Sequence, residues 1–240
     1  MRVITWDTND EASVLFEHTG TILPTDINVA GTIVGQAVAW GTQHRTFAWA
    51  YEPDAGVVEL PGVPTSYALE AYGSNDAGEI VGTALTPNPP GAPRRLALRW
   101  TERSLPPSVL LTPSACEGKD TAAYAINAGG RIVGWCNDLA LTWASASSAP
   151  EVLPSPPPLP MDTGPLLGAR ATNLNDSGDI IGWVGRTRGA ATIITSVGWT
   201  ATRRVVDLGE IELSGINDAR VTVGTRQSAD PVRVAVRVVW

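Results

Sequence analysis

The stretch Asn75-Asp-Ala-Gly-Glu-Ile-Val-Gly82 decides the fold, because versions of it recur through the whole chain. Four further phrases begin at an asparagine and end at a glycine seven residues later: Asn28–Gly35, Asn127–Gly134, Asn175–Gly182 and Asn217–Gly224. Successive asparagines are 47, 52, 48 and 42 residues apart. Self-similarity at this spacing indicates an array of like structural units.

The phrase predicts a tight turn between two antiparallel strands. An asparagine or aspartate at the start of a turn bonds its own backbone, and glycine adopts a positive φ without steric cost. Apolar residues precede the turn, and Ile-Val or a similar pair follows it, as in a bulged hairpin. The fifth copy has Arg220 in place of the turn glycine, which predicts a distorted turn there.

Two more strands are expected in each unit. An apolar strand ends in tryptophan at Trp49, Trp100, Trp143 and Trp199, and we expect these indoles in the core. About ten residues later comes a short strand such as Val57–Leu60. Four strands in a repeat of this length are typical of a propeller blade.

The predicted fold is therefore an all-β, five-bladed β-propeller formed by one domain, residues 1–240. Its blades are expected at about 22–60, 67–111, 120–153 and 168–208, with a closing blade built from 212–240 and 1–17. Joining both ends of the chain in one sheet would remove free sheet edges. Residues 2–6 and 232–240 both resemble the tryptophan-ending strand, so either could complete that blade, with Trp6 or Trp240 in the core.

Composition narrows the class of partner. The chain has 17 basic and 24 acidic residues and a net charge of −7, which argues against nucleic acid. Its apolar runs are shorter than the roughly 18 residues of a membrane-spanning helix. We expect a cytoplasmic protein from the lack of a signal peptide at Met1, or an extracellular one if a leader has been removed. Nothing indicates an oligomeric state.

The repeat resembles that of bacterial HAF-repeat proteins, a probable extracellular repeat family. The residues that carry the resemblance are Ile27–Gly35, His44-Arg-Thr-Phe-Ala-Trp49 and Val206-Asp207-Leu208. The resemblance implies a repetitive β-propeller-like fold and an extracellular location. It implies no particular activity.

Candidate binding residues lie where the repeats differ from one another. The asparagine turns share one rim, and the loops of the opposite rim vary, as binding loops on a rigid scaffold do. Variable residues on this rim could line a pocket for a ligand. The set that we expect to bind ligand is Trp40, Glu70, Tyr72, Tyr124, Trp135, Arg170, Trp183 and Glu212. Trp135 and Trp183 could instead pack between blades.

Some of these residues could act as catalytic acids or bases and not only as ligand-binding groups. If the protein is an enzyme, the candidate catalytic residues are Glu70, Arg170, Glu212 and His44, with Glu70 and Glu212 as a carboxylate pair. No metal site is expected, because Asp76, Asp176 and Asp218 fit turn chemistry and lack the pattern of a calcium loop. No cofactor motif is present. Cys116 and Cys136 could form a disulfide or remain two thiols.

The function predicted from these patterns is non-catalytic binding of a carbohydrate or a small aromatic or polycyclic metabolite. Two alternatives stay open. One is a small-molecule biosynthetic enzyme, a cyclase or a metal-free hydrolase, that uses an axial pocket. The other is a protein-interaction scaffold.

Overall fold

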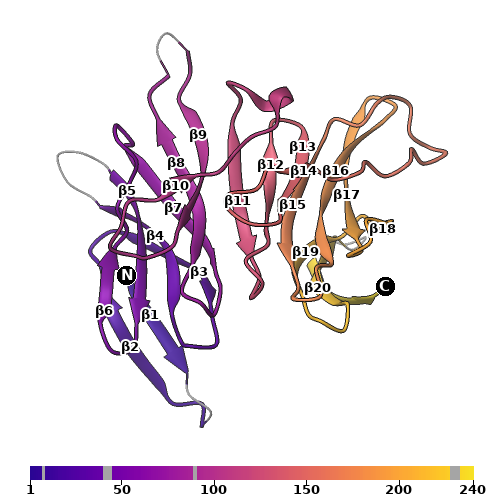
Figure 1. The fold of residues 1–240 in the computed structure, drawn as a ribbon. Helices are drawn as coiled ribbons and strands as arrows, with labels where there is room; N and C mark the ends of the chain where they lie inside the picture. Colours follow the sequence, from indigo (N-terminus) through magenta and orange to yellow (C-terminus); the bar gives the residue numbers. More distant parts are fainter. Residues whose placement is uncertain (7–8, 40–44, 89–90, 228–232) are drawn as a thin grey trace. The chain divides into compact units, whose positions relative to one another are not determined.

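A computed structural model describes residues 1–6, 9–39, 45–88, 91–227 and 233–240 (Figure 1). The chain forms two compact units, unit 1 (Met1–Leu110) and unit 2 (Leu111–Trp240). Both units are built from antiparallel strands apart from one parallel contact between β5 (Arg45–Glu52) and β7 (Ala68–Ser74) in unit 1, and the described part of the chain has a single turn of 3-10 helix at Ser114–Cys116. The all-β prediction is confirmed; the single-domain organisation stays a prediction. No described helix is long and apolar enough to cross a membrane.

Unit 1 contains two meanders that match the first two predicted repeats. Their strands are joined in one eight-stranded sheet, because Thr46 of the first meander pairs with Ala68 of the second. The strands are β3 (Thr21–Ile27), β4 (Ile33–Ala39), β5 (Arg45–Glu52), β6 (Gly56–Glu59), β7 (Ala68–Ser74), β8 (Ile80–Thr86), β9 (Arg94–Trp100) and β10 (Ser108–Val109).

Unit 2 contains two separate four-stranded sheets and a three-stranded sheet. The four-stranded sheets follow the predicted repeats closely and pair in chain order. Their strands are β11 (Thr121–Ile126), β12 (Ile132–Cys136), β13 (Leu139–Trp143) and β14 (Glu151–Val152), then β15 (Gly168–Leu174), β16 (Ile180–Arg188), β17 (Ala191–Trp199) and β18 (Val205–Gly209).

The strands near the two ends of the chain pair locally. β1 (Arg2–Trp6) and β2 (Ala12–Glu17) form a two-stranded sheet, whereas β19 (Glu212–Ile216), β20 (Val221–Gln227) and β21 (Arg233–Val239) form the three-stranded one. β21 thus occupies the place beside β20 that was predicted for the tryptophan-ending strand. The strand pairs of the described residues include no sheet common to both ends, so the closing blade stays a prediction.

The asparagine turns have the predicted geometry. In the second copy, Gly78 N–H donates to Asn75 O at 3.0 Å, and Glu79 N–H donates to Asn75 Oδ1 at 3.0 Å. Gly78 has a φ of 80°, in the left-handed region that glycine adopts freely. The turn glycines of the other three copies also have positive φ: Gly31, Gly130 and Gly178.

The predicted distortion of the fifth turn is wrong. Arg220 takes the glycine position with a φ of 56°, and its N–H still donates to Asn217 O at 3.0 Å. Its side chain donates from Nε to Asp179 Oδ2 at 2.8 Å, and this contact offsets the cost of a left-handed residue with a Cβ. The turn therefore keeps its shape with a different residue.

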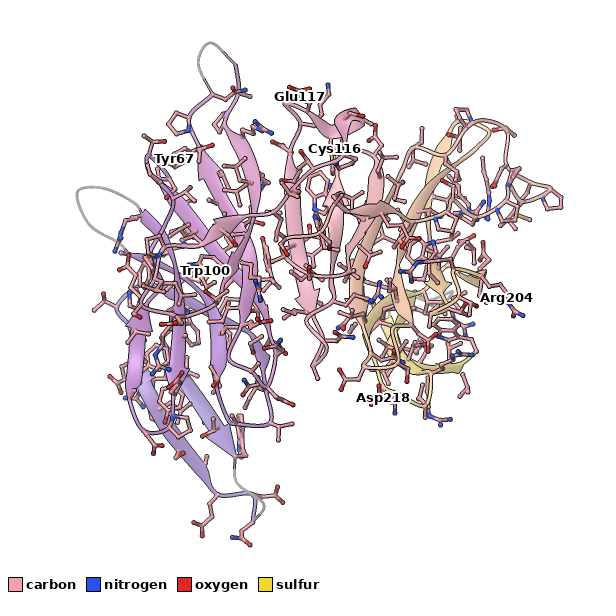
Figure 2. The ribbon with its side chains drawn as sticks, in the orientation of Figure 1. Tyr67, Trp100, Cys116, Glu117, Arg204 and Asp218 are labelled. Carbon is pink, nitrogen blue, oxygen red and sulfur yellow. A yellow bond between two sulfur atoms is a disulfide. The ribbon has the colours of Figure 1, made fainter. Side chains whose placement is uncertain are left out.

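Successive turns within each unit are bonded to one another through the repeat asparagine. Asn28 Nδ2 donates to Asn75 O at 2.8 Å in unit 1, and Asn127 Nδ2 and Asn175 Nδ2 donate to the carbonyls of Asn175 and Asn217 at 3.1 and 3.0 Å in unit 2. In each case the aspartate of the later turn accepts from the backbone of the earlier one. These aspartates, Asp76, Asp176 and Asp218, therefore join neighbouring repeats. Figure 2 labels Asp218 at the turn end of unit 2.

The tryptophans of the third strand of each repeat are core residues. Trp49, Trp100, Trp143 and Trp199 are fully buried. Three of them donate from Nε1 to a carbonyl that lies just after a fourth strand, as Trp100 does to Pro61 O at 2.8 Å. Trp6 is 66% exposed within unit 1, and Trp240 is half-buried against Gly198 in unit 2; which of them completes the closing blade stays a prediction.

A disulfide joins Cys116 and Cys136 in unit 2, with their Cα atoms 6.0 Å apart. Figure 2 shows Cys116 at the end of unit 2 opposite Asp218, the end that carries the variable loops. The bond ties the loop before β11 to the end of β12. It resolves the open question of the two cysteines.

Candidate functional site

The first strand of each repeat contains a β-bulge, and several of the predicted site residues lie at or beside it. In β15 the register shifts between Ala171 and Asn173, so that Thr172 is an extra residue opposite the β16 ladder. A bulge of this kind changes the direction of a side chain and increases the local twist. The extra residues in the five repeats are the positions three before the repeat asparagine: Thr25, Tyr72, Tyr124, Thr172 and Ser214.

The second glycine of the repeat phrase makes room for this bulge. A Cβ on Gly182 would lie 1.9 Å from Arg170 O, and a Cβ on Gly82 would lie 2.0 Å from Glu70 O. No side chain fits at such a distance. The glycine therefore holds the backbone of a predicted site residue against the neighbouring strand.

Unit 1 brings together two of the predicted site residues, Glu70 and Tyr72. Tyr72 Oη donates to Glu70 Oε2 at 2.5 Å, and Arg95 Nη1 donates to the same oxygen at 2.9 Å. The Glu70 side chain is 18% exposed. Its charge is therefore balanced inside the repeat by a half-buried arginine that the sequence did not single out.

Unit 2 brings together four more of the predicted residues. The Arg170 guanidinium carbon lies 4.0 Å from the ring centre of Trp135 and 5.1 Å from that of Trp183. Trp135 Nε1 donates to Tyr124 Oη at 2.9 Å, and Arg170 Nη1 donates to the same oxygen at 3.4 Å. Trp135 is 7% exposed, so the packing alternative describes it well; Trp183 is half-buried.

A cavity of about 450 Å³ adjoins this cluster in unit 2. It lies between the β15–β18 sheet and the β19–β21 sheet, and the Trp183 indole forms part of its wall. Two carboxylates, Glu210 and Glu212, also line it, together with Arg233 and apolar groups such as Ile194 and Leu213. An apolar cleft of this volume with a few charged groups is the usual form of a small-molecule site.

Both cavity carboxylates are paired with arginine. Arg188 Nη1 donates to Glu210 Oε1 at 2.5 Å, and Arg233 Nη1 donates to Glu212 Oε2. Glu212 belongs to the predicted set, while Glu210 and Arg233 were missed. A second acid two residues from Glu212 was the available signal for Glu210.

A buried ion network supports the cavity from behind. Arg186, which is fully buried, donates to Asp162 at 2.6 Å and to Asp207 at 2.8 Å, and Arg188 lies 3.5 Å from the other oxygen of Asp162. The Leu159 N–H and the Arg186 guanidinium hold the pKa of Asp162 below its ordinary value. The proline-rich loop that carries Asp162 is therefore fixed to β16, and through Arg188 so is Glu210.

The remaining predicted site residues are not brought together. Trp40 and His44 lie outside the described residues. Glu70 belongs to unit 1 and Glu212 to unit 2, so their pairing as two catalytic carboxylates stays a prediction. Among the described side chains, no cluster of three or more His, Cys, Asp or Glu residues suited to a metal ion is found.

Comparison with known proteins yields similarity to solved structures only. No family model matches the chain, so the HAF-repeat resemblance stays a prediction. No curated protein matches it either.

The similar structures are carbohydrate-active enzymes. A glycosyl hydrolase from Bacteroides ovatus is 10% identical, with a TM-score of 0.42 over 96% of this chain and 87% of that one. A putative glycosidase from Bacteroides thetaiotaomicron is 10% identical, with a TM-score of 0.42 over 98% and 91%. A third structure, from work on glycoside hydrolases of the GH130 family of mannoside phosphorylases, is 10% identical, with a TM-score of 0.39 over 92% and 84%.

This finding corrects the prediction of a non-catalytic ligand-binding protein. All three structures are described as glycoside-cleaving enzymes or members of their family, and none as a non-catalytic binding protein. Their similarity to this chain concerns the β-rich fold. The chemistry has to follow from the chain's own residues.

Proposed function

We propose that this protein is a hydrolase of carbohydrate substrates and that its active site is the 450 Å³ cavity of unit 2. The observation that carries the proposal is the joint presence of one indole, Trp183, and two carboxylates, Glu210 and Glu212, on the wall of one cavity. An aromatic face suits the apolar face of a sugar ring. Glycoside hydrolysis needs two carboxyl groups beside the scissile bond.

The two carboxylates differ in how firmly they are held. Glu210 is itself 57% exposed, but it is bonded to Arg188, whose side chain is only 16% exposed and is anchored at Asp162. Glu210 therefore suits the role that needs a fixed position, the base or nucleophile. Glu212 is paired with Arg233, and both side chains are more than 60% exposed. This pair can therefore separate when a substrate enters, which leaves the Glu212 carboxyl free to take up a proton and pass it to the leaving oxygen.

The proposed architecture is the five-bladed propeller. It is supported by five copies of one turn, by the meanders that follow four of them, and by the same turn-to-turn hydrogen bonds inside each unit. A compact chain of this length has a radius of gyration of about 18 Å. Small-angle scattering that yields a clearly larger radius would contradict a closed ring.

We also infer that the protein works in an oxidising compartment. The Cys116–Cys136 disulfide supports this inference, because such bonds persist in secreted and periplasmic proteins and are rare in the cytosol. It favours the extracellular alternative over the cytoplasmic one. A free-thiol assay on protein recovered from its native host would find two free thiols if the inference is wrong.

The function is tested with aryl glycosides that differ in sugar and anomeric configuration. We expect turnover of at least one substrate, and a loss of about 10²–10⁴-fold in kcat for Glu210→Gln and for Glu212→Gln. Glu117→Gln, an exposed glutamate at the end of the 3-10 helix, is the matched control and keeps the activity.

Two results would overturn the assignment. Full activity in a Glu210→Gln/Glu212→Gln double variant would remove this cavity as the active site. Loss of activity in Glu70→Gln alone would move the site to the Glu70–Tyr72–Arg95 cluster of unit 1.

A further inference from the structure

Arg170 differs from four other arginines of unit 2. Arg186, Arg188, Arg203 and Arg220 each meet a carboxylate. Arg170 makes no ion pair within the described part of the chain, although it is only half-exposed. Its one hydrogen-bond acceptor there is Tyr124 Oη, at 3.4 Å.

The free donors of Arg170 reach solvent. Buried polar atoms without a partner occur at several described residues, and no nitrogen of Arg170 is among them. The guanidinium has five N–H donors in a planar fork, and Tyr124 uses one of them. Within the described part of the chain, the cluster therefore presents unsatisfied donors of a permanent cation at the surface.

The two tryptophans hold this cation in place. A guanidinium near the faces of two indoles is attracted by both rings, and its long side chain loses freedom before any ligand arrives. A donor group that is already ordered pays less entropy when it binds. The Trp135–Arg170–Trp183 cluster is thus a preorganised anion-binding site as well as a packing contact.

The neighbouring cavity does not neutralise the charge of Arg170. Its two acids are matched by two arginines, Glu210 by Arg188 and Glu212 by Arg233. Trp183 is common to the cavity wall and to the Arg170 cluster. A ligand that contacts Trp183 in the cavity therefore lies beside a positive charge that no carboxylate of the described residues pairs with.

We infer that Arg170 recognises a carboxylate of the substrate, so that the proposed hydrolase acts on acidic sugars of the uronate class. The inference rests on the proposed function for the hydrolytic step and on the Trp135–Arg170–Trp183 cluster for recognition. The planar fork of arginine matches the two oxygens of a carboxylate in a bidentate pair. A neutral sugar would leave this charge without a partner.

The experiment compares matched sugars on the full chain. The probes are the methyl β-glycosides of glucuronic acid and glucose, the corresponding galacturonic acid and galactose pair, and methyl β-glucoside 6-sulfate. Dissociation constants are measured by calorimetry and by quenching of tryptophan fluorescence. We expect one uronate to bind about ten- to a hundredfold more tightly than its neutral partner, as for hydrogen bonds to a charged group, with a preference that weakens in salt.

The variants isolate the guanidinium. Arg170→Gln should bring uronate binding to the level of the neutral sugar. Arg170→Lys, which keeps the charge but loses the fork, should retain part of the preference. Arg204→Gln, an exposed arginine of the same unit without an ion pair in the described residues, is the matched control and should bind as the unchanged protein does.

Each outcome separates this inference from the hydrolase proposal. Equal binding of both members of each pair, a preference that survives Arg170→Gln, or no uronate binding overturns the inference, even if neutral glycosides are cleaved. Tighter binding of the sulfate overturns the choice of a carboxylate. If uronates bind through Arg170 but are not hydrolysed, the anion site stands and the hydrolase proposal fails.

Discussion

Glu70 in unit 1 and Arg170 in unit 2 occupy the same position of the repeat, five residues before its asparagine, yet their surroundings are opposite. Glu70 is surrounded by Tyr72 and Arg95, so its charge is satisfied within the repeat. Arg170 lies between two indoles and meets no carboxylate among the residues that the structure describes. Across the ladder, Glu70 faces Thr83, whereas Arg170 faces Trp183. The repeat thus sets the position of a side chain, and the residue across the ladder sets its chemistry.

The largest effect that can test this contrast concerns the two indoles of unit 2. Trp135 is buried, so Trp135→Ala should lower the free energy of unfolding by about 3–5 kcal/mol. Trp183→Ala should cost less than half as much, because this side chain is half-buried, and should abolish ligand binding. Chemical denaturation and calorimetry provide both readings. Equal losses of stability would make both residues core, and unit 2 would have no recognition surface at Trp183.

The next effect concerns the covalent constraint, which is present in unit 2 alone because the chain has two cysteines. Cys136 directly follows Trp135 at the end of β12. A Cys116→Ala/Cys136→Ala variant should lose about 3 kcal/mol of stability, as expected for a loop of this size. Melting curves with and without a reductant measure it. A reductant that lowers the melting temperature of the double variant as well would show that the disulfide is not the cause.

A smaller effect distinguishes the two charges directly. Glu70→Gln removes a charge-assisted hydrogen bond with Arg95 and should cost about 1 kcal/mol. Arg170→Gln removes cation–π contacts at a half-exposed site and should cost about 1 kcal/mol or less. The difference between the variants should be in binding: Arg170→Gln loses the uronate preference and Glu70→Gln keeps it. Loss of the preference in Glu70→Gln would show that the charge of unit 1 also contributes to recognition.

The smallest effect is the pH dependence of two aspartates, the half-buried Asp26 and the buried Asp179. Burial raises the pKa of Asp26 in unit 1, despite hydrogen bonds from Ser74. Desolvation also opposes the ionisation of Asp179 in unit 2, but the Arg220 side chain and the Ala201 N–H outweigh it and lower its pKa.

These shifts predict opposite slopes of stability against pH. A raised pKa contributes stability below the unfolded-state value that is lost as pH rises through the folded-state value, so Asp26→Asn should remove a decline above about pH 4. A lowered pKa contributes stability that is lost on acidification, so Asp179→Asn should flatten the decline below about pH 4. Urea denaturation from pH 3 to 7 measures both slopes. Parallel curves for each variant and the unchanged protein would contradict the assignment.

Much of the fold could be predicted from the sequence because each copy of the repeat contains residues that a particular backbone geometry requires. The glycine at positions such as Gly78 needs a positive φ, and the glycine at positions such as Gly182 lies against a carbonyl. These local requirements place the strands on either side of each turn. The fifth turn departed from expectation because a side-chain contact, Arg220 with Asp179, compensated for an unfavourable residue. Such a contact cannot be read from one turn alone.

The candidate site was predictable only in part. Position in the repeat identified Tyr124, Trp135, Arg170 and Trp183, which do cluster. It could not reveal that Arg95 neutralises Glu70, since that pair crosses from one strand to another at a separation of 25 residues. Nor could it place Glu210 on the cavity wall, because the ion network around Asp162 and Arg188 depends on the path of a proline-rich loop.

The asparagine that bonds one turn to the next also bears on how such a chain can grow. Within each unit the joint consists of the same pair of hydrogen bonds, an amide to a carbonyl and a backbone N–H to an aspartate. A duplicated copy of the repeat would carry the donors and the acceptors of both hydrogen bonds. It could therefore follow any other copy without new contacts having to evolve. Lengthening by whole repeats is then easy, whereas an insertion inside the eight-residue phrase would break two joints at once.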